Sequence, residues 1–201
     1  MAIKTANNQS MTAITALPSG VSAKSMILLA TETASSSATV SFTSNIDDTY
    51  SEYIFRFYDI HPATDGARLG FQVDTGTNTS YNITCTSTYF YAYHDEADTS
   101  TGLSYVAGRD QAQGTAFQNI SDPIGNANDE SCAGYLHIFE PSSSTFVKHF
   151  MGRTNIVHND SQSVENYSAG YFNTTTALTR VQFKMHSGNI DAGVIKMYGV
   201  A

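Results

Sequence analysis

Tyrosines and carboxylates are concentrated in one stretch of the chain, with the sequence YFYAYHDEAD. Tyr89, Tyr91 and Tyr93 alternate with other residues, and Asp95 and Glu96 follow them closely. An exposed tyrosine ring can stack on a sugar ring, and nearby polar groups can bind sugar hydroxyls. These residues are therefore candidate contacts for a glycan or for a protein partner. The alternative is that the tyrosines belong to the core and to a subunit interface, because tyrosine suits both.

Other oxygen-rich side chains have the chemistry to bind a hard cation such as Ca²⁺. They form three groups: His94 with Asp95, Glu96 and Asp98; Asn126, Asn128, Asp129 and Glu130; and Asp47 with Asp48. None of these groups has the spacing or the glycine of an EF-hand, and no histidines form a zinc-binding motif. Turn capping and loop solubility explain them better, so we predict no metal site and no cofactor.

Hydrolysis would require a nucleophile or a pair of carboxylates held in a cleft. Glu52, Glu140 and Glu165 fall in or near expected strands, which leaves a glycosidase pair open. The chain has no G-x-S-x-G motif and no phosphate-binding loop. We therefore predict no catalytic residues and expect that the protein is not an enzyme.

Short β-strands are the elements expected to position these residues, because apolar and polar residues alternate with a period of two in many segments. We expect residues 52–60 to form a central strand, since both of its sides are apolar or aromatic. We also predict three hairpins, at 25–43, 132–154 and 178–198, each with turn residues at its centre. Further strands are expected at 67–74, 81–93, 117–120 and 164–173, with a long excursion at 95–113.

These eight to ten expected strands predict an all-β fold, an antiparallel β-sandwich of jelly-roll-like topology. No helical pattern and no internal repeat is evident. Residues 1–24 are polar and small, with no clear periodicity, so alone they should be disordered. We expect them to form an extended N-terminal arm that lies on a neighbouring subunit or on the rest of the domain, and we favour a neighbouring subunit. Residues 25–201 would then form a single sandwich domain.

The overall composition limits the function. The net charge of −8 and the pI of about 5.0 argue against binding to nucleic acid or to an anionic membrane. Cys85 and Cys132 are the only cysteines, and buried free thiols are expected. The N-terminus lacks the apolar region of a secretory signal, and the longest apolar run, Met26–Ala30, is too short to span a membrane. We expect the protein to be made in a cytoplasm and to leave it, if at all, by cell lysis.

Several segments together resemble one family. They are Thr12–Ser44, Tyr89–Asp98, Pro141–Phe150 (PSSSTFVKHF), Ala169–Thr175 (AGYFNTT) and Phe183–Gly199 (FKMHSGNIDAGVIKMYG). They resemble short virion proteins of marine bacteriophages, of cyanophages and related phages, which are described as structural or tail-fibre proteins. The resemblance covers nearly the whole chain and includes no catalytic set.

The resemblance implies a β-sandwich that is displayed on a phage particle and assembled in the host cytoplasm. We expect a tail-associated fibre or adaptor that binds other virion proteins through residues 1–24 and forms a homo-oligomer, with a trimer favoured. One alternative is a capsid decoration or head-fibre protein. Another is a glycan-binding module that recognises a host receptor through Tyr89, Tyr91, Tyr93 and the neighbouring carboxylates.

Overall fold

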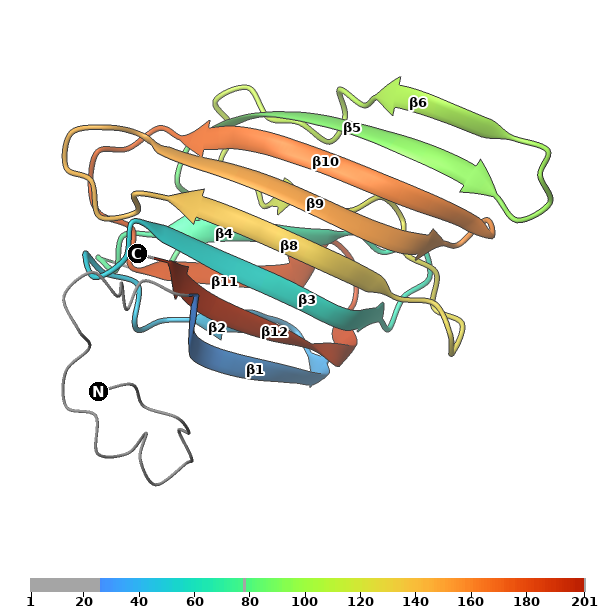
Figure 1. Cartoon of the computed structure of the whole chain (residues 1–201), viewed down its shortest axis with the longest axis horizontal. Helices are drawn as coiled ribbons and strands as arrows, with labels where there is room; N and C mark the ends of the chain where they lie inside the picture. Colours follow the sequence, from blue (N-terminus) through green and yellow to red (C-terminus); the bar gives the residue numbers. More distant parts are fainter. Residues whose placement is uncertain (1–25, 78, 201) are drawn as a thin grey trace, which may run out of the picture.

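A computed structural model describes residues 26–77 and 79–200 of the chain. These residues form two antiparallel sheets that pack face to face, as the sequence predicts (Figure 1). The strands are β1 (Ile27–Ser37), β2 (Val40–Phe42), β3 (Glu52–Pro62), β4 (Leu69–Asp74), β5 (Cys85–Asp95), β6 (Thr101–Tyr105), β7 (Gln118–Asn119), β8 (Cys132–Phe139), β9 (Lys148–His158), β10 (Gln162–Phe172), β11 (Arg180–Met185) and β12 (Ile190–Val200).

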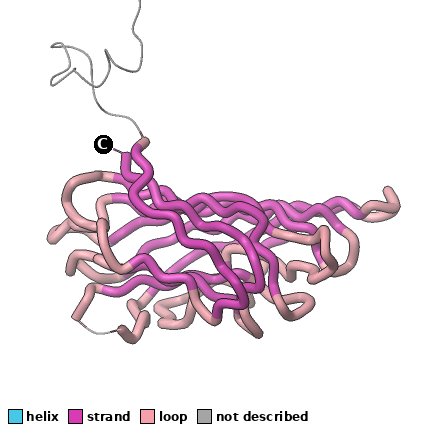
Figure 2. Tube along the Cα trace, turned by 90° about the horizontal axis from the view of Figure 1, so that it is seen from below, coloured by secondary structure: helices cyan, strands magenta, loops and turns pink. Residues whose placement is uncertain are grey.

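The larger sheet has eight strands in the order β1-β12-β3-β8-β9-β10-β5-β6, and the smaller has four in the order β2-β11-β4-β7. Figure 2 shows strands joined by loops and turns in the described residues. No helix in this described part of the chain has the length and apolar character of a transmembrane segment. The predicted arm, residues 1–24, lies outside the described residues.

The core lies between the two sheets and is rich in phenylalanine. Phe183 of β11 lies at its centre, and its ring centroid is 5.4 Å from those of Phe55 and Phe57 in the opposite sheet. Phe42 and Phe71, from the strands on either side of β11, lie 6.2 and 6.3 Å from the same ring. The alternation of Val181, Phe183 and Met185 with polar residues therefore places the smaller sheet on the larger one.

Pairs of strands that cross from one sheet to the other run side by side. The segment β1–β2 lies beside β12–β11, since β1 pairs with β12 and β2 pairs with β11. On the other side of β12–β11 lies the segment β3–β4, and next to that lie β8 and β7. This rolled arrangement gives the sandwich its jelly-roll-like topology.

Two of the three predicted hairpins are wrong for this reason. The segments at 25–43 and at 178–198 each contain two strands and a turn, but the two strands belong to different sheets. The turns are corners of the roll and they contact each other. The side-chain amide of Asn189 donates to the carbonyl of Ser36 (2.9 Å), and the amide of Ala63 donates to the carbonyl of Asn189 (3.0 Å). Periodicity predicts a strand but does not say which sheet it joins.

Other predicted elements are confirmed. Residues 132–154 form the hairpin of β8 and β9, and β3 is a central strand between β12 and β8. The expected excursion at 95–113 is partly wrong, because it contains β6, which pairs with β5. Leu103 and Tyr105 of β6 remain 74% and 56% exposed, so the strand has little core burial to mark it in the sequence.

The segment between β6 and β8 lies against the inner side of the larger sheet and contributes buried polar groups. Asp122 donates its backbone N–H to the side-chain oxygen of Asn166 in β10 (3.0 Å), and Thr154 of β9 donates to the carbonyl of Ile120 (2.6 Å). Arg109 forms an ion pair with the buried Asp122. These bonds satisfy buried polar atoms that the small sheet does not reach.

Candidate functional site

The tyrosines of the candidate site face inward. Tyr89, Tyr91 and Tyr93 share one side of β5, as their spacing predicts, and that side faces the interior. Tyr89 is fully buried, and its hydroxyl donates to the side-chain oxygen of Asn166 (2.6 Å). Burial raises the pKa of the Tyr89 phenol above its ordinary value. Tyr91 and Tyr93 are half-buried and pack against the core. Tyr89 is therefore a core residue, as the alternative prediction states, and no ligand can reach it.

The carboxylates lie apart from Tyr89, at the turn between β5 and β6. The Asp95 carboxylate accepts the backbone N–H groups of Thr99 (2.8 Å) and Ser100 (2.9 Å). These bonds, with that from the Thr99 hydroxyl first among them, lower the pKa of Asp95. Glu96 is exposed in the same turn. Asp95 thus holds a turn together, and Tyr93 contacts the same turn through the hydroxyl of Ser100 (3.2 Å), whereas the buried Tyr89 lies apart from it.

The outer face of the larger sheet carries a second set of aromatic residues, which no local sequence pattern indicates. Side chains that lie opposite each other on neighbouring strands share a face. From β12 to β6, one such line of opposed residues crosses the sheet. We call it the cation–aromatic row: Lys196, Arg56, Tyr135, Arg153, Tyr167, Phe90 and Tyr105.

Ring stacking and cation–π contacts hold this row together. Phe90 and Tyr167 are stacked, with centroids 4.8 Å apart and planes 6° apart. The guanidinium of Arg153 lies 5.3 Å from the centroid of the Tyr167 ring. Arg153 also forms an ion pair with Glu165. Arg56 lies 5.9 Å from the ring of Tyr198, a neighbour of the row on β12. Each cation–π contact contributes about 0.5–1 kcal/mol at an exposed site. These contacts therefore help to fix the positions of the side chains on this face.

A shallow groove of about 290 Å³ lies next to the row, on the same outer face. Its floor is formed by Ala169 and Gly170 of β10, which are small residues between Tyr167 and Tyr171. Its walls include Tyr171 and His149, whose ring centroids are 6.1 Å apart. The groove therefore offers apolar surface flanked by ring nitrogen and hydroxyl groups.

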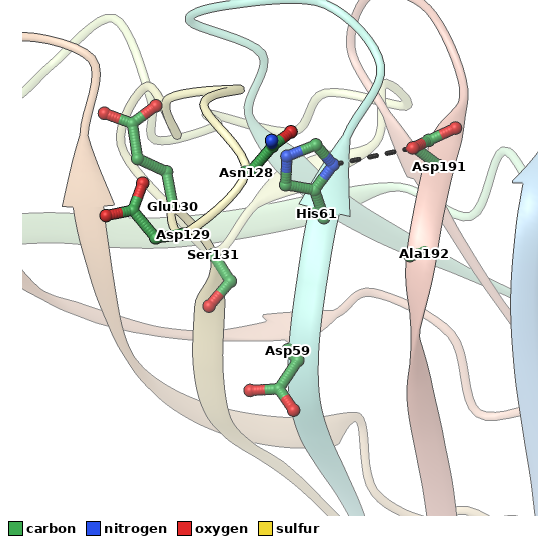
Figure 3. Close-up of a pocket in the computed structure, with 8 residues that line it drawn as sticks. All are labelled: Asp59, His61, Asn128, Asp129, Glu130, Ser131, Asp191 and Ala192. Atoms are coloured by element: carbon green, nitrogen blue, oxygen red, sulfur yellow. Dashed lines mark ion pairs between the residues drawn. The ribbon is translucent and has the colours of Figure 1, made fainter.

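The acidic and amide residues proposed as cation ligands do not converge. In Figure 3, Asp129 and Glu130 lie on one side of His61, and Asp191 lies on the other, with its carboxylate 3.7 Å from His61 Nδ1. Glu130 accepts the N–H of Ala127 (2.6 Å), as a capping residue does. Nowhere in residues 26–77 and 79–200 do three His, Cys, Asp or Glu side chains form a group that could hold a metal ion.

Two of the glutamates considered as a glycosidase pair, Glu52 and Glu165, lie apart. Glu52 is on β3 and Glu165 is on β10, with β8 and β9 between them. Three strand spacings amount to about 14 Å, which exceeds the separation that glycosidase carboxylates require. Glu52 pairs instead with His137, and Glu165 pairs with Arg153. Glu140 follows β8 and donates its backbone N–H to the carbonyl of Ser51 (2.7 Å), so it lies beside Glu52, whose carboxylate is already paired with His137.

The cysteines are free and buried, as predicted. Burial raises the pKa of both thiols to about 12, so neither is a reactive thiolate at neutral pH.

Comparison of the chain with known protein families, with curated proteins and with solved structures found no match.

Proposed function

We propose that this protein is a structural component of a bacteriophage virion. It would act by binding other molecules through its surface, and not by catalysis. The observation that carries the proposal is the outer face of the larger sheet. It is broad, and it exposes Tyr105, Phe90, Tyr135 and Met151 by 56%, 39%, 37% and 58%. A contiguous exposed face of this kind marks an interaction surface.

The composition of this face supports a contact role. Aromatic residues, Met and Arg are enriched at protein interfaces, whereas Lys, Glu, Asp and Ser are depleted. The cation–aromatic row contains four aromatic residues, two arginines and one lysine. The resemblance of the chain to short phage virion proteins supports the same conclusion.

Within the particle, we propose a tail-associated position, as a fibre or an adaptor, and assembly as a homo-oligomer, with a trimer favoured. Residues 1–24 would bind a neighbouring virion protein. The first described residue, Met26, is 41% exposed and precedes the edge strand β1. A capsid decoration or head-fibre position is the alternative.

Mass spectrometry and antibody labelling of purified particles test the proposal. We expect the protein in the particles, with the label on the tail; label on the head would favour the alternative. Deleting residues 1–24 should reduce incorporation while the isolated sandwich still folds. Absence of the protein from purified particles, or a stable monomer by sedimentation, would contradict the virion role or the oligomer respectively.

Glycan recognition is the second candidate function, and the groove beside the row favours it. Because Tyr89 is buried, we propose contacts on the outer face instead, where Tyr171 and Tyr167 flank the groove floor. We expect Tyr171→Ala to reduce adsorption of particles to host cells, whereas Tyr91→Ala should leave adsorption unchanged. The reverse result would return the site to the inner side of β5.

A further inference from the structure

Two cations of the row lie directly opposite each other and have no acidic partner. Lys196 of β12 is opposed to Arg56 of β3. Among the described residues, neither forms an ion pair; Lys196 lies 5.1 Å from the ring of Tyr58, and Arg56 lies over Tyr198. Arg153, by contrast, is paired with Glu165.

This arrangement is unfavourable for the sheet alone, because like charges directly opposite each other on antiparallel strands repel. It is also unusual for this chain, which carries 18 carboxylates against 10 Lys and Arg residues. On this outer face Glu52 and Glu165 are engaged by other residues, and the exposed Asp59 of β3 has no ion pair with Arg56 or Lys196. Arg56 and Lys196 are therefore two neighbouring cations without an ion pair on an acidic protein, and an anion that contacts both would offset their repulsion.

We propose that the outer face of the larger sheet binds an acidic polysaccharide, with a sulfate or carboxylate held by Arg56 and Lys196 and a sugar ring in the groove of β9, β10 and β5. The inference rests on the proposed function, in which this face makes the contacts of the protein. It specifies that the ligand is negatively charged, which the tyrosines alone do not indicate. It also assigns the binding of that charge to Arg56 and Lys196.

The path between the two parts of the site runs across the strands. From Arg56 on β3, the next strands on this face are β8 and β9, and β9 contributes His149 and Met151 to the groove. Two strand spacings, about 10 Å, separate β3 from β9. A ligand that covers both parts must therefore be longer than one sugar ring. A charged oligosaccharide meets that requirement, whereas a monosaccharide would occupy the groove alone.

The chemistry of the face favours a polysaccharide over a peptide. The strand N–H and C=O groups are paired within the sheet, so they cannot satisfy the backbone of a peptide lying on its face. A sugar chain has no such obligatory amide groups. It presents C–H surfaces to rings such as Tyr171 and hydroxyls to Thr86 and Thr88, which line the groove. An oligothymidylate presents phosphates instead of sulfates to the same two cations, so it is the competing probe in the titration below.

Calorimetric titration of the full chain with a heparin octasaccharide tests the inference, with dextran as the neutral probe. We expect heparin to bind with an affinity that falls as salt rises, and dextran to bind far more weakly. Arg56→Gln and Lys196→Gln should each weaken heparin binding roughly tenfold, the loss expected for one charge-assisted hydrogen bond. Tyr171→Ala should weaken binding to heparin without changing its salt dependence.

Lys184→Gln is the matched control, because Lys184 also sits over an aromatic ring, Phe117 at 4.3 Å, but belongs to the smaller sheet. It should leave heparin binding unchanged. Lys196→Gln removes both a repulsion from Arg56 and a cation–π contact with Tyr58, which offset each other, so the melting temperature should change little while affinity falls. A residue needed only for folding would lower both.

Three results would overturn the inference: no binding of heparin, equal loss in Lys184→Gln, or binding of poly-glutamate or of an oligothymidylate as tight as that of heparin. A virion role is tested separately by the presence of the protein in particles. Particles that contain the protein while heparin does not bind would reject the polysaccharide and leave the proposed function intact.

Discussion

At the scale of single residues, Phe183 connects the two sheets. Its ring contacts aromatic rings from both sheets, and the side chain is fully buried. The sequence predicts this burial, because Phe183 alternates with Gln182 and Lys184 on a short strand. Removing the ring would leave a cavity at the centre of the core that its rigid aromatic neighbours cannot fill.

We therefore expect Phe183→Ala to lower the free energy of unfolding by about 3–5 kcal/mol. Urea denaturation followed by circular dichroism measures the change. Phe146→Ala is the control, because Phe146 is 72% exposed and its loss should change stability by less than about 0.5 kcal/mol. Equal effects of the two substitutions would contradict the placement of Phe183.

His186 makes the stability depend on pH. Partial burial lowers the pKa of its imidazole below 6.5, and the nearby Arg68 and Arg109 lower it further. Its Nδ1 accepts the backbone N–H of Arg68 (2.9 Å), which a protonated Nδ1 cannot do. Because the folded pKa lies below the unfolded one, the unfolded chain takes up the proton first as the pH falls.

We expect stability to decrease as the pH drops below 6.5 and to level off once the pH passes the folded pKa. The slope for one proton is at most about 1.4 kcal/mol per pH unit, and solvent screening of this exposed side chain will reduce it. Urea midpoints measured between about pH 7.5 and pH 5 test this. His186→Gln should reduce the loss of stability between pH 6.5 and about pH 5. An unchanged loss would mean that other titratable groups cause it.

The candidate site shows what single residues reveal in a sequence and what they do not. The spacing of Tyr89, Tyr91 and Tyr93 correctly predicts that they share one side of a strand. The intervening Phe90 is aromatic too, so composition does not distinguish the inner side from the outer side. Partners such as Asn166, which is distant in the sequence, decide that Tyr89 faces inward.

At the scale of elements, an irregularity between β3 and β12 sets the pairing of the central strands. Asp59 has φ 50° and Gly193 has φ 122°, and the register shifts between Ala192 and Val194. A Cβ on Gly193 would lie 2.7 Å from the carbonyl oxygen of Asp59 and 2.8 Å from Cα of Ile60. Both the backbone conformation and the close approach therefore require glycine here.

We expect Gly193→Ala to cost about 1–3 kcal/mol, the range for a strained backbone conformation. Gly108→Ala is the matched control, since nothing lies within 4 Å of a Cβ at that position and its φ is not positive. Thermal denaturation of both variants measures the difference. If both variants have the melting temperature of the original protein, then β3 and β12 do not approach each other closely at Gly193.

The elements were predicted better than their connections. Local alternation identifies β3, β4 and β8, because each carries a regular apolar side. The corners after β1 and β11 look like hairpin turns in the sequence. Their identity depends on contacts between distant residues, such as Asn189 with Ser36, which no local pattern contains. The cation–aromatic row was missed for the same reason, since register across seven strands is a property of the whole sheet.

At the scale of the whole molecule, one continuous core joins the two sheets. The buried cluster includes Cys85 on β5 and Cys132 on β8, together with residues from both sheets. A shared core predicts that the strands around both thiols unfold in a single cooperative step.

Thiol labelling across a urea series, read for each cysteine by peptide mass spectrometry, tests this prediction. In native buffer both thiols should resist labelling, because they are buried and the pKa of each is raised to about 12. Both should become reactive at the same urea midpoint. Labelling of Cys85 at lower urea than Cys132 would show that the β5–β6 side opens independently.

The pairing of β1 with β12 also has a use in protein engineering. Ile27, the first residue of β1, lies opposite Gly199 near the end of β12. The two ends of the sandwich are therefore antiparallel neighbours, and a loop of two to five residues suffices to connect such strands. The chain from Ile27 to Val200 should accept circular permutation with a linker of that length, with new ends opened at Gly108, where the backbone is uncrowded.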